Sequence, residues 1–308
     1  MPLFTSSSKK TLIAFLFLFL LFGGYKLYYI AFYVEQNRTS EKLFWYKKTF
    51  APNDQDILLV GDSRVYRGLS PAAMAAVLEG SKVLNFGYSS AGLEPFFLDA
   101  AVKKLSAGGK RILVLGVTPH SLTAIAAQNK HYREQAHQEN LPFWVKNIEY
   151  FFGRDSTIAA VKYLLSVKQG SDHYDRIFHD DGWCECYYLL DPAQGLPIYK
   201  KLFSSYQVSA EVTTIMLDKV KELTKAGITI FAFRPPTYPA MEQLEDSISG
   251  FVEKDFIQGF EAAGGHWLVL DDRFSFDCYD GSHITGTAAK KLSRELGQKI
   301  ASSLATMQ

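Results

Sequence analysis

Five short apolar runs, separated by segments with helical spacing, constrain the fold of this 308-residue chain more than any other feature. The runs occupy residues 56–60, 82–86, 111–115, 228–233 and 266–270. Apolar residues recur at helical spacing over residues 71–78, 95–105, 210–226, 248–263 and 287–304. Strands covered on both faces are apolar throughout, and their alternation with helices is typical of a parallel sheet. The sequence therefore predicts an α/β fold, a flavodoxin-like three-layer sandwich around a central five-stranded parallel sheet.

The N-terminal segment predicts a membrane anchor. Lys9 and Lys10 precede an apolar run over residues 12–34. At about 1.5 Å of helix per residue, this run can cross a hydrocarbon core of about 30 Å. Tyrosines gather at its far end, as in an interfacial belt: Tyr25, Tyr28, Tyr29 and Tyr33. We therefore expect residues 1–34 to form an uncleaved anchor that contacts the lipid bilayer through residues 12–34.

Two other interpretations of this segment stay open, a cleaved signal peptide and a buried core helix. No small-x-small cleavage site follows the run, and the run is long for a signal peptide. The lysine pair favours a cytoplasmic N-terminus, although Lys42, Lys47 and Lys48 on the other flank weaken that bias. The prediction is a single-pass protein of the cytoplasmic membrane whose main domain is extracytoplasmic.

The rest of the chain divides into a juxtamembrane connector, residues 35–55, and one α/β domain, residues 56–308. This domain carries an insertion at about residues 120–208, partly helical over residues 141–152 and 156–167. The net charge of +1 leaves no basic excess for neutralising phosphates, which argues against nucleic-acid binding. Neither GxGxxG nor GxxxxGK[ST] follows the first strand, which argues against a nucleotide-binding domain.

The insertion contains several residues with more than one interpretation. In an oxidising compartment Cys278 would pair with Cys184 or Cys186, leaving one thiol over. Potential metal ligands also occur there, but their spacing matches no known metal motif: His173, Asp175, His179, Asp180, Asp181, Cys184 and Cys186. We expect a polar cap segment, no metal site and no organic cofactor. The nearby aromatic residues would either stack on a sugar or pack the cap onto the sheet: Phe143, Trp144, Tyr150, Phe151 and Phe152.

Residues suited to nucleophilic catalysis follow the first and last predicted strands. Ligands of open parallel sheets bind at the carboxyl ends of the strands. Ser63 directly follows the first strand, and Asp280 and His283 follow the last. A serine needs a base to take its proton, and an imidazole base needs a carboxylate on its other nitrogen. We predict Ser63 as nucleophile, His283 as base and Asp280 as its partner, the alternative being that all three only cap helices or turns.

The other strand ends supply candidate binding groups. The backbone N–H groups of Gly87 and Ser63 would donate to a developing oxyanion. Five further residues are candidates for substrate binding: Arg64, Asn85, Thr118, His120 and Arg234. The arginines suit a phosphate or carboxylate group, with an ordinary ion pair inside the protein as the alternative. His120 either assists the oxyanion or is a solvated loop residue, and Asp62 is expected to be a structural turn residue.

Three short motifs resemble those of a known superfamily. GDSR at residues 61–64, NFG at 85–87 and DGSH at 280–283 look like blocks I, II and V of the SGNH/GDSL hydrolases, in the same order. The resemblance covers most of residues 55–305 and implies a Ser63–His283–Asp280 triad with Gly87 as an oxyanion donor. Block III departs, because GVTPH at 116–120 lacks the usual Asn. Loss of one such donor costs about 10²–10³ in rate, which argues against a fast general esterase.

The layout resembles divergent membrane-anchored members, the SGNH-like proteins of teichoic-acid D-alanylation and alginate O-acetylation. That similarity implies ester hydrolysis or O-acyl transfer on an acylated cell-envelope glycan or polymer, through an acyl-serine intermediate. It also implies other membrane biosynthetic proteins as partners. The residues do not distinguish water from a sugar hydroxyl as acceptor. The missing Asn favours an alternative, a catalytically degenerate domain that binds envelope glycan or scaffolds a biosynthetic complex.

Overall fold

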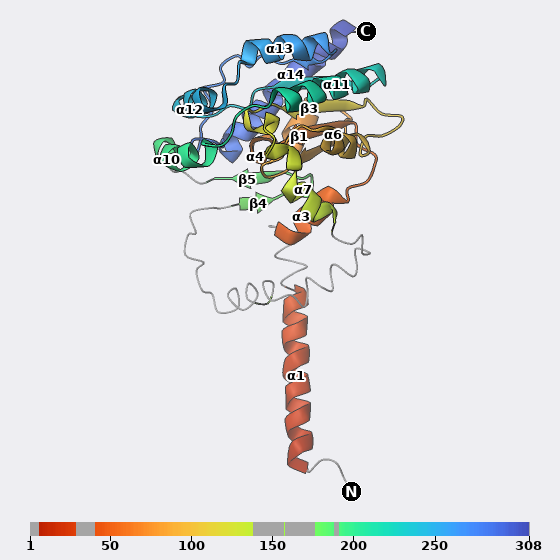
Figure 1. The fold of residues 1–308 in the computed structure, drawn as a ribbon. Helices are drawn as coiled ribbons and strands as arrows, with labels where there is room; N and C mark the ends of the chain where they lie inside the picture. The colour runs from red at the N-terminus through yellow and green to blue at the C-terminus, as the bar shows by residue number, and fades with distance from the viewer. Residues whose placement is uncertain (1–5, 29–40, 138–156, 158–175, 188–190, 308) are drawn as a thin grey trace. The chain divides into compact units, whose positions relative to one another are not determined.

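A computed structural model describes residues 6–28, 41–137, 157, 176–187 and 191–307 (Figure 1). Its contacts divide the chain into two compact units, residues 1–43 with 140–172 and residues 44–139 with 173–308. Each unit is described by itself.

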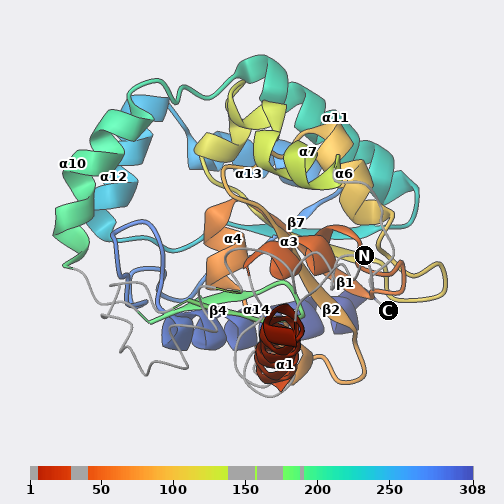
Figure 2. The same ribbon diagram turned by 90° about the horizontal axis from the view of Figure 1, so that it is seen from below.

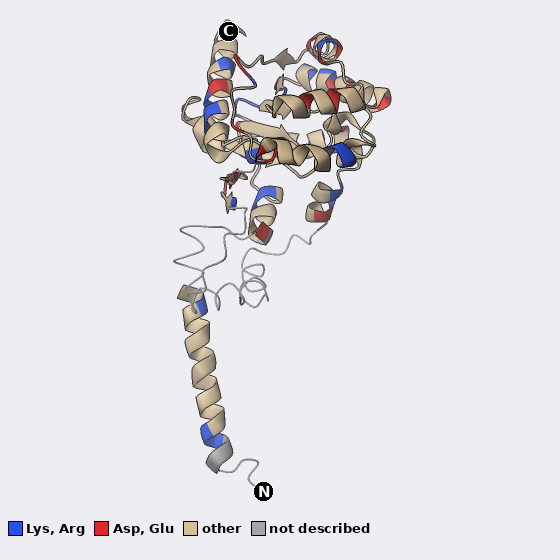
Figure 3. Ribbon diagram, turned by 90° about the vertical axis from the view of Figure 1, so that its left-hand side faces the viewer, with Lys and Arg blue, Asp and Glu red and all other residues tan. Residues whose placement is uncertain are grey.

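The described part of the first unit is dominated by helix α1, Ser6–Tyr28. Its residues Lys9–Tyr28 are long and apolar enough to cross a membrane. Figure 3 shows this helix without charge between the lysines near its two ends. The helix continues through Gly23, Gly24 and Lys26. The remainder of the predicted anchor, with Tyr29 and Tyr33, lies outside the described residues.

A parallel sheet of five strands in the order β2-β1-β3-β6-β7 forms the centre of the second unit. The strands are β1 (Ile57–Gly61), β2 (Val83–Gly87), β3 (Ile112–Gly116), β6 (Thr229–Phe233) and β7 (His266–Trp267). The first three are buried along their whole length, as the apolar runs predicted. Strand β7 is shorter than the run over residues 266–270, and Val269 is 70% exposed.

Helices cover both faces of this sheet, which confirms the three-layer prediction (Figure 1). Successive strand residues point to opposite faces, so Leu58 and Ile57 belong to different cores. One face packs against α6 (Pro95–Val102), α11 (Ala210–Lys225) and α13 (Glu253–Ala262). The other packs against α4 (Ser63–Gly68), α5 (Pro71–Ala75) and α14 (Gly286–Met307).

The strand order reverses at β1. The chain passes from β1 to β2 on one side of it, and β3, which follows β2 in the sequence, lies on the other side of β1. The carboxyl ends of strands at such a reversal border the usual ligand crevice of open α/β sheets. Helix α4 begins at that point, directly after β1. The topology therefore places Ser63 at the position where a ligand site is expected.

The segment between β3 and α11 corresponds to the predicted insertion. Its described elements are η2 (His120–Leu122), η3 (Ala126–Gln128), α7 (Lys130–Ala136), the antiparallel strands β4 (Arg176–Phe178) and β5 (Cys184–Cys186), and α10 (Pro192–Phe203). Helix α10 lies beside α12, Pro239–Ser249, a helix that the sequence did not predict (Figure 2). The predicted helix at 141–152, most of that at 156–167, the nearby aromatic residues, His173 and Asp175 all lie outside the described residues.

Helix α3, Glu41–Thr49, was not predicted and lies within the range assigned to the connector. From Phe44 onward this helix belongs to the second unit, where Phe44, Trp45 and Lys48 are buried.

The three cysteines are free thiols, so the predicted disulfide between Cys278 and one of the other two is absent. Cys184 and Cys186 instead have their Sγ atoms 3.9 Å apart on β5. Cys278 instead forms an isolated antiparallel β-bridge, a backbone pairing, with Ile284.

Candidate active site

Ser63, His283 and Asp280 form a continuous hydrogen-bonded relay at the carboxyl end of β1. The Ser63 Oγ atom lies 2.8 Å from His283 Nε2, and His283 Nδ1 lies 2.8 Å from Asp280 Oδ2. Ser63 is partly exposed, whereas Asp280 and His283 are buried. The hydroxyl can therefore meet a substrate, while the two groups that handle its proton are shielded from water.

Asp280 is held as a carboxylate by its surroundings. Its Oδ1 atom accepts the backbone N–H groups of Ser282 and His283, at 2.9 and 2.8 Å. Burial alone would raise the pKa of Asp280, but the interaction with His283 and these hydrogen bonds outweigh it and lower that pKa. Burial lowers the pKa of His283, although Asp280 opposes the shift. A neutral imidazole beside an ionised carboxylate is the resting state that a general base requires.

The turn between β1 and α4 is fixed by Asp62 and Thr118. The Asp62 carboxylate accepts the Arg64 backbone N–H at 2.9 Å and so caps α4. The Thr118 hydroxyl donates to the other Asp62 oxygen at 2.7 Å. Asp62 is thus a turn residue, as expected, and Thr118 supports Ser63 through Asp62.

Asn85 and Gly87 are engaged with each other. The Asn85 amide donates to the Val65 and Leu69 carbonyls, each at 2.8 Å, and its oxygen accepts the Gly87 N–H at 3.0 Å. An oxyanion would have to displace the amide oxygen before Gly87 could donate to it. Ser63 differs, because no carbonyl within the helix can accept the N–H of the first residue of α4. The oxyanion roles of Ser63 and Gly87 stay predictions.

The two candidate arginines are both buried and both lie in ion pairs, the alternative considered for each. Arg64 donates to Glu245 at 2.9 Å and to the Ser282 hydroxyl at 3.1 Å, which ties α4 to the turn that carries Asp280. Arg234 donates to Asp246 and Glu253.

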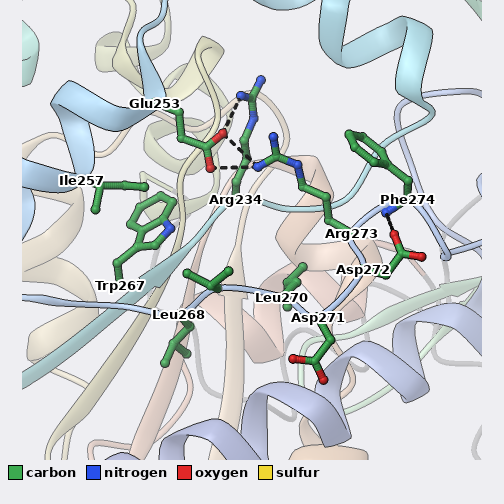
Figure 4. A pocket seen from close by; sticks show the side chains of 11 residues that line it. Arg234, Glu253, Ile257, Trp267, Leu268, Leu270, Asp271, Asp272, Arg273 and Phe274 are labelled. Carbon is green, nitrogen blue, oxygen red and sulfur yellow. Dashed lines mark hydrogen bonds and ion pairs between the residues drawn. The ribbon is translucent and has the colours of Figure 1, made fainter.

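Arg234 also borders a cavity of about 370 Å³ near β7. Figure 4 shows the guanidinium groups of Arg234 and Arg273 turned toward Glu253. Acidic groups thus satisfy both cations of this cavity, which makes it a poor site for an anionic substrate group.

His120 is buried, with 8% of its surface exposed, and its ring packs in a tilted arrangement 4.3 Å from that of Tyr206. The prediction of a solvated loop histidine is therefore wrong. Within the part of the chain that the structure describes, neither ring nitrogen has a hydrogen-bond partner. Burial lowers the pKa of His120, so its ring is neutral near pH 7.

Sequence reasoning missed two residues, one that contacts the relay and one that contacts Gly87. Tyr199 on α10 donates its hydroxyl to Asp280 Oδ2 at 3.1 Å. Lys48 on α3 donates to the Gly87 carbonyl at 2.5 Å and lies 5.0–5.3 Å from four aromatic ring centroids. Tyr199 lies 81 residues before its partner Asp280, and neither Tyr199 nor Lys48 belongs to a recognisable pattern.

Among the described residues, no group of three or more His, Cys, Asp or Glu side chains could hold a metal ion. His179 instead pairs with Glu185 at 2.9 Å, and Asp180 pairs with Lys47.

The three sequence motifs and the Ser63–His283–Asp280 relay are the features to compare with known proteins. The chain resembles the SGNH hydrolases. No protein-family model matches it, and no curated protein matches it significantly. It is similar to solved esterase structures at low identity. Est24, a carbohydrate acetylesterase from Sinorhizobium meliloti, is 12% identical with a TM-score of 0.38, over 81% of this chain and 99% of that chain.

Two further structures show the same level of likeness. An inhibitor-bound aryl esterase from M. smegmatis is 12% identical with a TM-score of 0.38, over 80% of this chain and 99% of that chain. A family two carbohydrate esterase from Clostridium thermocellum is 12% identical with a TM-score of 0.34, over 82% and 65%. The resemblance to the SGNH hydrolases therefore depends on the motifs and the relay.

Proposed function

We propose that this chain is a membrane-anchored, extracytoplasmic serine esterase or O-acyltransferase of the SGNH type, acting on an acylated envelope glycan or polymer. One observation carries the proposal: a partly exposed serine hydroxyl lies 2.8 Å from an imidazole whose other nitrogen lies 2.8 Å from a buried carboxylate. This is the arrangement that nucleophilic acyl transfer requires.

In the proposed first half-reaction, His283 Nε2 takes the Ser63 proton as Oγ attacks the ester carbonyl carbon. The carbonyl π electrons move to oxygen, giving a tetrahedral oxyanion to which the Ser63 N–H can donate. Asp280 stabilises the imidazolium through Nδ1. Collapse of the intermediate breaks the bond to the alcohol, which takes the proton from His283, and leaves an acyl-Ser63 ester.

In the second half-reaction, His283 removes a proton from an acceptor hydroxyl, which attacks the acyl carbon. Ser63 Oγ leaves and recovers its proton from His283. Water as acceptor releases a carboxylic acid, and a sugar hydroxyl yields a new ester. Both outcomes use the same three side chains, so the acceptor that is bound decides between them.

Helix α1 supports the anchored part of the proposal. Residues Lys9–Tyr28 have the length and composition of a membrane span. Lysines at the N-terminal end favour a cytoplasmic N-terminus and an external domain, where envelope polymers are the available esters.

A specific observation favours a second candidate, a degenerate domain that binds glycan or scaffolds a biosynthetic complex. The Gly87 N–H is engaged with Asn85, and the segment GVTPH at the end of β3, residues 116–120, contains no Asn. The oxyanion would then have a single backbone donor, Ser63.

A fluorophosphonate probe, which reacts with activated serines, tests the proposal. The full chain in detergent should be labelled, and Ser63→Ala should lose all labelling because the nucleophile is gone. His283→Ala should label at least about 10³-fold more slowly. Ser275→Ala, which removes an exposed hydroxyl, serves as the matched control and should label like the natural chain. An intact chain that stays unlabelled at every pH would rule out the enzyme and favour the degenerate domain.

A further inference from the structure

A fourth side chain joins the relay from helix α10. The Tyr199 hydroxyl lies 3.1 Å from Asp280 Oδ2 and 3.4 Å from His283 Nδ1. Asp280 Oδ2 therefore has two donors, the Tyr199 O–H and the His283 N–H, and Oδ1 has the two backbone donors described above. Four donors converge on this one carboxylate.

The close seating of α10 shows that the Tyr199 contact is built into the fold. A Cβ atom added to Gly195 would lie 2.0 Å from the Asp280 carbonyl oxygen. One added to Gly281, which has a φ of +82°, would lie 2.7 Å from the Pro192 carbonyl oxygen. Both glycines are needed for the first turns of α10 to approach the backbone of the Asp280 turn this closely.

Tyr199 is turned toward the relay, while its neighbours Ile198 and Lys200 are exposed. Its ring packs 5.3 Å from that of Phe203 on the same helix, which limits its freedom. Burial, together with the charge of Asp280, raises the pKa of Tyr199. The phenol therefore stays protonated at neutral pH and donates to the carboxylate.

We propose that Tyr199 is a positioning residue of the Ser63 relay, which limits how strongly Asp280 stabilises the protonated form of His283. This inference rests on the proposed function. A carboxylate that accepts a further hydrogen bond is less basic and attracts the imidazolium less strongly. The phenol thereby keeps His283 in the neutral form that can accept the serine proton.

Other groups also face the imidazole and the carboxylate. They are Arg64 and Arg67 from α4, Tyr279 stacked on the imidazole at 5.8 Å, and Cys278 beside Asp280. Removal of the Tyr199 hydroxyl alone leaves all of them in place, so a change in the pH profile can be assigned to that hydroxyl.

The test measures fluorophosphonate labelling rates of the full chain in detergent as a function of pH. In Tyr199→Phe the acidic limb should move to higher pH by about half a unit, because one donor to Asp280 is lost. At pH values well below the midpoints of both proteins, the variant should label about threefold more slowly than the natural chain. Gly195→Ala, which moves α10 away from Asp280 and keeps the phenol, should shift the limb in the same direction. Tyr132→Phe removes the hydroxyl of a buried tyrosine on α7 and should leave the profile unchanged.

Three results separate the possible failures. If Tyr199→Phe is labelled with an unshifted limb, the inference is wrong and the proposed function stands. If its rate falls by one factor at every pH, Tyr199 only packs, and the inference is again wrong. If the natural chain is not labelled at any pH, the proposed function fails first.

Discussion

At the scale of single residues, the protonation of His283 decides whether Ser63 can act. Burial lowers the pKa of His283 more than the Asp280 carboxylate raises it. The imidazole is the active base only above its own pKa, so labelling by the fluorophosphonate should rise with pH through a midpoint below about 6.5, the ordinary imidazole value. Labelling rates between about pH 4 and pH 8 would measure this midpoint. A midpoint above that ordinary value would mean that Asp280, and not burial, dominates the pKa of His283.

The sequence was informative about the residues of the relay and uninformative about their hydrogen-bond partners. Strand-end positions are fixed by topology, so Ser63 and His283 were expected to meet, and they lie 2.8 Å apart. The partner of Arg64 is Glu245, 181 residues away on a helix that was not predicted. Local sequence contains no information on such a pairing, so an arginine beside the nucleophile looked available for a substrate.

At the scale of helices and strands, burial on both faces made the strands predictable. The first three observed strands each differ from the predicted runs by one residue at either end. Helix α10 gave no such signal, because Pro197 lies inside it and its apolar residues Ile198 and Leu202 are 70% and 50% exposed. Tyr199 was missed for that reason.

Helix α3 contains Lys48, which is buried in the domain. Because burial changes the pKa of this lysine, the stability of the domain should depend on pH. Burial holds the pKa of Lys48 well below 10.5. In the window between that lowered pKa and 10.5 the unfolded chain binds more protons than the native chain, so the free energy of unfolding should rise with pH. The slope for one such group approaches about 1.4 kcal/mol per pH unit.

Lys48→Met should remove this contribution while keeping a side chain of similar length among the aromatic rings. Other lysines and tyrosines titrate in the same range, so the difference between the two proteins is the quantity to measure. Urea unfolding of both from about pH 8 to about pH 10 provides it. Parallel pH profiles for the natural chain and Lys48→Met would show that Lys48 is not buried in the way described.

At the scale of the whole molecule, α1 is long and apolar enough to cross a membrane, which makes the proposed anchor testable. If residues Lys9–Tyr28 span a bilayer, the full chain should stay with membranes through an alkaline carbonate wash, which strips peripheral proteins. A truncated chain of residues 41–308 should appear in the soluble fraction and still be labelled by the fluorophosphonate. Release of the full chain by carbonate would contradict the anchor, with no consequence for the relay.

The boundary between anchor and domain can be located by a second truncation. Residues 41–308 retain α3, whereas residues 56–308 lose the buried Phe44 and Trp45. Trp45 packs against Tyr66 and Tyr88, and Phe44 packs against Trp45. Removal of even one buried aromatic side chain costs about 3–5 kcal/mol. In a domain of this size that lowers the melting temperature by about 10 °C or more. Thermal unfolding of the two truncated chains should show this difference, because α3 is part of the core beside Gly87. Equal melting temperatures would mean that α3 does not stabilise the domain and is only a connector.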